Sequence, residues 1–467
     1  MKKILITLVL FCTMNSINAQ NPFLEKYQTP YATVPFNLIK EEHYEPAFDE
    51  GIRRQNQEID AIVNNSEAPT FENTIEAFER SGELLDRVNA VFSNMLGAET
   101  NDELQDIAQR IMPLLSEHSN NITLNEKLFK RVKCIYEQKE KLELSAEQSQ
   151  LLDNIYDSFI RHGANLEGDA RKKYRELTGE LSRLTLTYND NTLKETNQYK
   201  LVLTNEKDLK GLPEIVVEAA EETAKNEGIK GWVFTLHAPS YIPFLTYADN
   251  RELRQQLYMA YNTKCTHNDP YNNLDIVRKI VNTRMQIAQL LGYNNFAEYS
   301  LKKRMAENSE RVYTLFDQLL ESYTPTAQAE YEEVSKFARA EQGNQFVVMP
   351  WDWSYYSNKL KDQKYNINEE MLRPYFELSQ VKKGVFGLAE KLYGIRFKLN
   401  PEIPVYHPEV EAYEVYDQNN KLLAIFYADF HPRAGKRSGA WMTSFKEQWI
   451  VSESTCIEFS ISGTHAD

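Results

Sequence analysis

Helical periodicity over residues 21–203 is the feature that most constrains how this chain can fold. In PTFENTIEAFERSGELLDRVNAVFSNML, large apolar residues recur every three or four positions, the spacing of one helix face. These residues are Ile75, Phe78, Leu85 and Phe92, and the same period returns at Tyr174, Leu177, Leu181, Leu184 and Tyr188. Asn73, with Glu76 three residues later, resembles a capping box. We therefore expect long amphipathic helices that pack as antiparallel neighbours in a first helical lobe.

The pattern stays mainly helical and turns to strands late in the chain. A short strand is predicted at 231–236, with a domain boundary near Ile242–Pro243. The helices expected are 214–226, 251–261, 274–291, 309–342 with Pro325 inside, and 381–393. Period two then appears at 395–399, 412–417 and 421–429, which predicts a small sheet. We expect a mainly α, two-lobed protein, divided into an N-terminal lobe at 20–242 and a second domain at 243–449.

The N-terminus predicts export. Lys2 and Lys3 precede an apolar run from Ile4 to Phe11, and Ala19 offers a small residue for cleavage, so residues 1–19 are typical of a secretory signal. This run is too short to span a bilayer. A net charge of -15 disfavours binding to nucleic acid phosphates. After cleavage, three scattered cysteines remain, Cys134, Cys265 and Cys456. This odd set with no CxxC pair favours neither a disulfide framework nor a cysteine zinc site. We expect an exported, periplasmic protein without a membrane span.

The stretch Asp429 to Phe445, DFHPRAGKRSGAWMTSF, is the predicted threshold of an active site. It follows the apolar run Leu422 to Tyr427, which is typical of a buried strand. A basic loop rich in glycine after such a strand is the kind of connection that lines a cleft. Arg433, Lys436 and Arg437 could bind a peptide carboxylate, but we favour their pairing with the excess acidic surface.

Other candidate residues each have a structural and a functional interpretation. His237, His407 and His431 lie near predicted sheet or loop segments, and a structural or solvated role is favoured because no second ligand at metal spacing accompanies them. Residues 349–356 hold four aromatic residues that could form a substrate-facing wall, although a packed helix start capped by Asp352 is favoured. The acidic clusters, Glu218, Glu221 and Glu222 and then Glu330, Glu332 and Glu333, are interpreted as solvated helix faces.

Several blocks in order along the chain resemble the thimet oligopeptidase family of zinc metallopeptidases, in its bacterial dipeptidyl carboxypeptidase and oligopeptidase A type. The blocks are PTFENTIEAFERSG, GWVFTLHAPSYIPFLTYADNRELRQQLYMAY, QIAQLLGYNNFAEYSLKKRMA, WDWSYYSNKL, MLRPYFELSQVKKGVFGLAEKLYGIRF, VYHPEVEAYEVYD and FYADFHPRAGKRSGAWMTSF. The resemblance covers about Pro22 to Phe445. It implies a two-lobed helical peptidase that acts on short peptides. It also implies a zinc ion held by a His-Glu-x-x-His helix, with the glutamate as general base.

No catalytic or metal-binding residue can be carried over from that family. None of the eight histidines is followed by glutamate, so the chain has no His-Glu-x-x-His motif. In the family this helix lies beyond the segment that matches Phe426 to Phe445. We therefore expect a chain truncated before the zinc motif by a frameshift or premature stop, inactive alone, with no zinc bound by the residues present.

The last residues are expected to depart from the family pattern. Residues 450–467, IVSESTCIEFSISGTHAD, are interpreted as a divergent, disordered tail, with a strand around Cys456 to Ile461 as the alternative. We expect a monomer that is prone to aggregate or unfold beyond about Pro401. The alternative function is that of a non-enzymatic exported helical protein that binds peptides or a partner.

Overall fold

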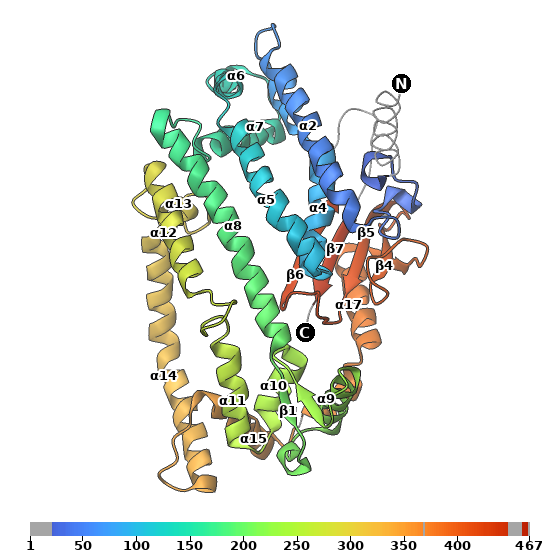
Figure 1. The fold of residues 1–467 in the computed structure, drawn as a ribbon, viewed down its shortest axis with the longest axis vertical. Coiled ribbons are helices and arrows are strands. Elements are labelled where there is room, and N and C mark those ends of the chain that lie inside the picture. The colour runs from blue at the N-terminus through green and yellow to red at the C-terminus, as the bar shows by residue number, and fades with distance from the viewer. Residues whose placement is uncertain (1–20, 368, 447–459, 466–467) are drawn as a thin grey trace, which may run out of the picture. The chain divides into compact units, whose positions relative to one another are not determined.

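The computed structural model describes residues 21–367, 369–446 and 460–465 (Figure 1). These residues divide into two compact units. Of the described residues, the first unit contains 21–186, 282–292, 389–446 and 460–465, and the second contains 187–281, 293–367 and 369–388. The signal segment predicted at 1–19 lies outside the described residues. The chain is mainly α-helical with a small sheet late in the sequence, as predicted. The predicted domain division at 242/243 stays a prediction.

The N-terminal helices of the first unit confirm the predicted helical period. Short turns come first, η1 (Pro22–Leu24), η2 (Pro30–Ala32) and η3 (Glu41–His43). The following elements are α2 (Tyr44–Val63), η4 (Phe71–Glu76), α3 (Ala77–Glu79), α4 (Glu83–Ala98), α5 (Asp102–Thr123), α6 (Glu126–Tyr136), η5 (Lys139–Lys141), α7 (Ala146–Arg161) and α8 (Gly168–Gln198), the last of which continues into the second unit.

The predicted cap at Asn73 is wrong by three residues. Thr70 is the N-cap of the π-helical turn η4, and its hydroxyl accepts a hydrogen bond from the Asn73 backbone N–H at 3.1 Å. In return the Asn73 side-chain oxygen accepts from the Thr70 N–H at 2.9 Å. Asn73 is thus the third helical residue of a capping box, because Thr70 has the extended backbone that an N-cap requires.

The second unit contains the remaining helices and a two-stranded sheet. Its elements are β1 (Leu201–Leu203), η6 (Glu206–Leu209), α9 (Glu214–Asn226), β2 (Trp232–Phe234), α10 (Ala238–Tyr247), α11 (Arg251–Asn262), α12 (Leu274–Leu290), α13 (Phe296–Leu301), α14 (Ser309–Gln342), α15 (Pro350–Tyr365), α16 (Glu369–Leu372), η7 (Arg373–Tyr375) and α17 (Leu378–Tyr393), of which α12 and α17 continue into the first unit. Gly292 and Gly394, with φ of +85° and +70°, follow α12 and α17, whose ends lie within one residue of the predicted 291 and 393.

A five-stranded sheet completes the first unit, in the order β3-β4-β5-β7-β6. Its strands are β3 (Arg396–Leu399), β4 (Glu411–Tyr416), β5 (Leu422–Asp429), β6 (Ala440–Lys446) and β7 (Ser460–His465). The backbone of β7 pairs in parallel with β5 and antiparallel with β6. The preference for a disordered tail is therefore wrong for residues 460–465, while residues 447–459 lie outside the described part of the chain.

One apolar core joins this sheet to the N-terminal helices. Phe48 on α2, Phe92 on α4 and Tyr427 on β5 are fully buried in the same cluster. Phe36 places its ring edge-on against the rings of Tyr427 and Phe445. Residues from both ends of the sequence thus hold the sheet against α4, which fixes the end of β5 where the predicted loop begins. No described helix is both long and apolar enough to cross a membrane.

Candidate functional site

Asp429, the last residue of β5, is a fully buried carboxylate with four side-chain hydrogen bonds. The Arg433 guanidinium donates to both carboxylate oxygens, at 2.9 and 2.8 Å. Lys436 Nζ donates to Oδ1 at 3.1 Å and the Tyr406 hydroxyl donates to Oδ2 at 3.0 Å. A buried carboxylate is stable only when it is paired and hydrogen-bonded, and this set of donors meets that requirement.

The same cations tie the loop after β5 to the C-terminus of α4. Arg433 donates to the Ala98 carbonyl at 2.6 Å and forms an ion pair with Glu99. A cation at this position satisfies one of the carbonyls left unpaired at a helix C-terminus and complements the helix dipole. The buried Lys436 Nζ also donates to the backbone carbonyls of Asp429 at 2.9 Å and His431 at 3.1 Å.

Backbone contacts fix the rest of this loop. The Thr100 N–H donates to the Gly435 carbonyl at 2.7 Å, and the Arg437 N–H donates to the Gly97 carbonyl at 2.9 Å. A Cβ atom on Gly435 would lie 2.6 Å from the Thr100 carbonyl oxygen, so this close approach requires glycine. The loop that leads into β6 is therefore held along its length by α4 and the residues that follow it.

The electrostatics of this cluster keep its groups charged. Burial alone would raise the pKa of Asp429, but the hydrogen bonds from Arg433 and Lys436 outweigh burial and hold that pKa below its ordinary value. Burial likewise lowers the pKa of Arg433, and the hydrogen bond to Asp429 more than reverses this effect. Burial and the neighbouring Asp429 charge raise the pKa of the Tyr406 hydroxyl.

The chemistry of the Asp429 cluster is structural. Its carboxylate faces two cations and a hydroxyl, so it is a poor base, and the raised pKa makes the Tyr406 hydroxyl a poor acid. The favoured interpretation of Arg433 and Lys436 as paired with acidic residues is confirmed. Their partners are the buried Asp429 and, for Arg433, the partly exposed Glu99, whereas the prediction named the acidic surface. The third predicted cation, Arg437, is held through its backbone N–H by the Gly97 carbonyl, and burial lowers the pKa of its guanidinium. The sequence offered one signal for this cluster: an aspartate at the end of a predicted strand, followed by arginine four residues later and lysine seven residues later.

The three candidate histidines do not gather at one place. His237 is the N-cap residue of α10 in the second unit. His407 Nδ1 lies 3.3 Å from the Glu409 backbone nitrogen and 3.7 Å from its carboxylate, within the same turn. His431 is exposed and contributes its backbone carbonyl to Lys436. Sequence reasoning favoured structural or solvated roles, and these contacts agree with it.

The second unit has its own buried carboxylate, Asp352 on α15. Its side chain is fully buried, caps the helix by accepting from the Met349 N–H at 3.1 Å, and pairs with Arg251 at 2.7 Å and Arg254 at 2.9 Å. Tyr355 and Tyr356 are buried beside it, whereas Trp353 is 38% exposed, so the packed helix start is confirmed for two of the four aromatic residues. The N-cap residue is Met349, and Asp352 caps the helix as the third helical residue of a capping box. Sequence reasoning missed the two arginines, which lie about a hundred residues earlier in the chain.

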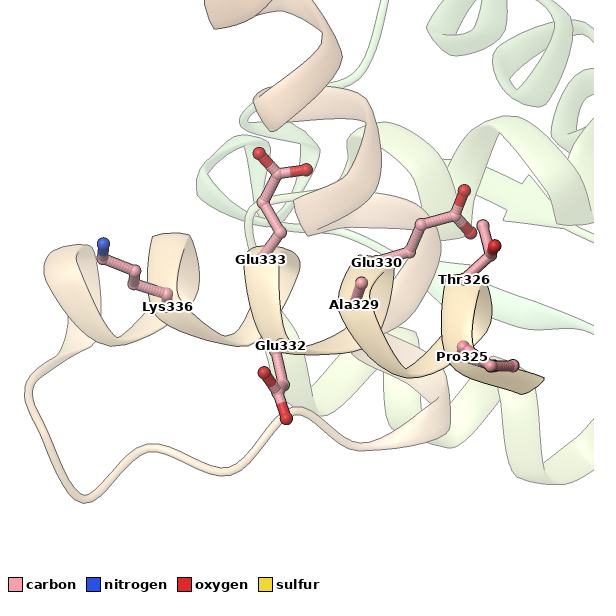
Figure 2. A pocket seen from close by; sticks show the side chains of 7 residues that line it. All are labelled: Pro325, Thr326, Ala329, Glu330, Glu332, Glu333 and Lys336. Carbon is pink, nitrogen blue, oxygen red and sulfur yellow. The ribbon is translucent and has the colours of Figure 1, made fainter. Parts of the chain in front are cut away.

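A shallow hollow lies along α14 and holds the second acidic cluster (Figure 2). Its volume is about 730 Å³, and it is lined by Pro325, Thr326, Ala329, Glu330, Glu332, Glu333 and Lys336. Figure 2 shows that Glu332 points away from the side of the helix to which Glu330 and Glu333 point. Glu333 forms an ion pair with Lys364. The carboxylates do not converge, as expected for a solvated helix face.

The residues described here do not fit a zinc ion. Zinc in proteins requires three or four converging nitrogen, sulfur or carboxylate ligands. Within residues 21–367, 369–446 and 460–465, no group of three or more His, Cys, Asp or Glu side chains is arranged to hold a metal. The buried carboxylates at Asp429 and Asp352 already face arginine or lysine, which excludes them as ligands.

Comparisons with known proteins find similarity along almost the whole chain. The sequence model of Peptidase family M3 matches residues 244–461. Dipeptidyl carboxypeptidase of Escherichia coli is 35% identical over 447 residues, which cover 95% of this chain and 66% of the E. coli protein. Oligopeptidase A of the same organism is 33% identical over 426 residues, covering 90% of this chain and 62% of that protein. The organellar oligopeptidase A of Arabidopsis thaliana is 29% identical over 437 residues, covering 91% and 54%. The chain thus spans between 54 and 66% of the length of these three curated relatives.

Proposed function

Because this chain belongs to peptidase family M3, we propose that it forms the larger part of a zinc-dependent metallopeptidase that hydrolyses short peptides. The observation that carries the proposal is the 35% identity to the E. coli dipeptidyl carboxypeptidase over 95% of this chain. Residues 244–461, which match the family model, include Asp429, Arg433 and Lys436 and the strands β3 to β6. The proposed role of these residues is to hold the sheet and its edge strand β6 in place beside the peptide.

We further propose that this chain does not hydrolyse peptides by itself. The 467 residues contain no His-Glu-x-x-His motif, which supplies two zinc ligands and the general base in the resembling family. The described residues offer no alternative metal site. Activity therefore requires the part of the enzyme that the relatives have and this chain does not match.

A chimera tests the peptidase assignment. Residues 21–446 are joined to the part of the E. coli dipeptidyl carboxypeptidase that this chain does not match, and the product is assayed on short peptides with mass-spectrometric detection. We expect hydrolysis that a chelator abolishes and zinc restores. Release of C-terminal dipeptides would indicate a peptidyl-dipeptidase, and internal cleavage an oligopeptidase. A folded, zinc-loaded chimera without hydrolysis would refute the assignment.

The chain alone provides the matched control. Calorimetry with the same peptides and a hydrolysis assay with added zinc address whether it binds without turnover. Binding without turnover supports the alternative of a non-enzymatic peptide-binding protein. Chelator-sensitive hydrolysis by the chain alone would contradict the proposal that it is inactive.

Export to the periplasm is a separate proposal. It is supported by Lys2 and Lys3, the apolar run from Ile4 to Phe11 and the small Ala19. Cell fractionation followed by N-terminal sequencing tests it. We expect a periplasmic protein that begins at Gln20, and retention of the full N-terminus in the cytoplasm would exclude export.

A further inference from the structure

The first unit contains two separate apolar clusters. The inner cluster joins α2, α4 and α5 to the sheet, through residues that include Phe48, Ile111 and Tyr427. The outer cluster joins the C-terminal halves of α2 and α5 to η4, α6 and α7, through residues that include Ile59 and Ile122. Figure 1 shows the sheet at one end of α2 and α5, and α6 and α7 at the other end. Helices α2 and α5 therefore pass from the inner cluster to the outer cluster.

A polar layer lies between the two clusters. It is formed by Gln55 on α2, His118 on α5, and Ser81 and Gly82 in the turn before α4. Along the chain, each of these positions lies between residues of the inner cluster and residues of the outer cluster. His118 Nε2 lies 2.7 Å from Gln55 Oε1, and the Gln55 amide nitrogen donates to the Ser81 carbonyl at 3.3 Å. One chain of hydrogen bonds thus connects α5, α2 and the turn.

The turn before α4 approaches this polar layer closely. Gly82 has a φ of +88°, and a Cβ atom on it would lie 2.2 Å from the Gln55 amide nitrogen, so the approach requires glycine. The Gly82 N–H donates to the Glu58 carboxylate of α2 at 2.7 Å. Gln55 is therefore held between the turn on one side and His118 on the other.

The hydrogen bonds determine which nitrogen of His118 carries the proton. Because the Gln55 amide nitrogen donates to Ser81, the Gln55 side-chain oxygen faces His118 and accepts from Nε2–H. The neutral imidazole, with Nδ1 unprotonated, satisfies this bond. His118 is only 6% exposed, and in the part of the chain that the structure describes Nδ1 has no hydrogen-bond acceptor. A second proton would therefore place a charged donor without a protein acceptor in a nearly buried layer.

The charged side chains around His118 do not compensate such a proton. Each of these groups has another partner, and they are Glu58 on α2, Arg80 before α4, Glu117 on α5 and Arg175 on α8. Glu117 and Arg175 pair with each other at 2.8 Å. Burial lowers the pKa of the His118 imidazole, and no charge of a described side chain offsets this effect. The layer thus favours neutral His118.

We propose that the polar layer around His118 is a pH-sensitive coupling between the two apolar clusters. With neutral His118, the hydrogen bonds through Gln55 to the turn hold the outer cluster against the inner cluster. Protonation charges the layer, so the outer cluster, with α6 and α7, opens while the inner cluster and the sheet stay closed.

The direction of the pH effect follows from linkage. In the open state His118 takes up a proton at its ordinary pKa, whereas in the closed state it does so only at lower pH. The stability that the layer contributes is therefore fully present above the ordinary histidine pKa. It falls as the pH drops through this value towards the lowered pKa of the closed state.

Hydrogen exchange of the full chain at about pH 7.5 and about pH 5 tests the proposal. The readout is the protection factor of the α6 and α7 amides relative to that of the β5 amides, because this ratio removes the intrinsic effect of pH on exchange. We expect the wild-type ratio to fall at least about threefold on acidification. H118Q retains an amide donor but does not titrate, so its ratio should not change. Circular dichroism establishes that the variants fold.

The matched control is H162Q. His162 is an exposed histidine at the C-cap of α7, beside the outer cluster, and its replacement should leave the wild-type response intact. An equal fall of the ratio in H118Q and in wild type would overturn the proposal. So would a parallel loss of protection in α6, α7 and β5 of the wild-type chain, because the two clusters would then open as one.

The variant Q55E reverses the expected sign. It places a carboxylate against His118 Nε2, which favours the imidazolium, so the protection ratio should rise on acidification. A fall as large as that of wild type would contradict the role of His118. Nuclear magnetic resonance of the His118 Cε1–H in the wild-type chain needs no variant to fold. This proton should titrate below the ordinary histidine pKa, and a midpoint at or above that value would also refute the coupling.

Discussion

Replacement of Asp429 by asparagine tests whether the buried carboxylate holds β5, α4 and β6 together. The Asp429 and Lys436 side chains are completely buried, and that of Arg433 is 11% exposed. D429N preserves the volume of the side chain but removes the charge that both cations face. Loss of one partner from a buried ion pair costs about 3–5 kcal/mol, because the other charge stays buried without compensation.

The lower end of this range applies here. The asparagine oxygen still accepts one hydrogen bond, and Arg433 keeps its contacts with Glu99 and the Ala98 carbonyl. We therefore expect a loss of about 3 kcal/mol in the free energy of opening of this region, which is an increase on the order of a hundredfold in its opening constant.

Native-state hydrogen exchange measures this free energy directly. Amides of β5 and β6 should exchange on the order of a hundredfold faster in D429N, whereas amides of α10 and α11 in the second unit serve as an internal reference. The control is D275N, since Asp275 and its partner Arg278 are 77% and 71% exposed and a surface pair contributes little. Exchange in β6 of D429N within twofold of wild type would refute the reasoning.

Three further predictions concern other sites. Four side chains hydrogen-bond the buried Glu414 and, against the effect of burial, lower its pKa to about 2. The stabilisation from this carboxylate is therefore present above the ordinary glutamate pKa and is lost as the pH falls towards 2. In acid titrations of unfolding, E414Q should lack this loss, and an unchanged pH profile would contradict the assignment. G435A should destabilise the first unit in denaturant unfolding, because the added Cβ would meet the Thr100 carbonyl oxygen. The control G384A, in α17 with open space around it, should be neutral or stabilising. Equal changes in stability from the two variants would count against the clash. D352N leaves Arg251 and Arg254 without their carboxylate partner and should lower the melting temperature of the second unit. Hydrogen exchange of the β5 amides should stay unchanged. A shift in melting temperature of less than about a degree would contradict this prediction.

The sequence predicts the elements well because their periods are local properties. The helix α9 begins and ends at the predicted residues, and α11, α12 and α14 agree to within about one residue. The boundaries of β3, β4 and β5 follow equally closely, since alternation of apolar residues depends only on neighbours along the chain. The cap at Thr70 was missed because two candidate cap residues lie three positions apart, and only the extended backbone at Thr70 distinguishes them.

The Asp429 cluster is harder to predict because its partners are distant in sequence. Arg433 and Lys436 belong to the same loop as Asp429, so their pairing is partly local. Glu99 lies 334 residues before Arg433, and nothing in the sequence around α4 indicates that its C-terminus receives a cation from that loop. Such contacts form because the apolar core packs the sheet against the N-terminal helices. The hydrophobic period of one segment does not predict which distant segment it will pack against.

Helices α14 and α17 show the limit of predictions from hydrophobic periodicity. An amphipathic period states that a helix has an apolar face, but it does not state which polypeptide covers that face. For α5, whose Leu104, Ile107 and Ile111 are buried in the core of the first unit, the partner is within the described residues. For α14 the same kind of stripe faces solvent, with Phe316 and Tyr323 more than half exposed.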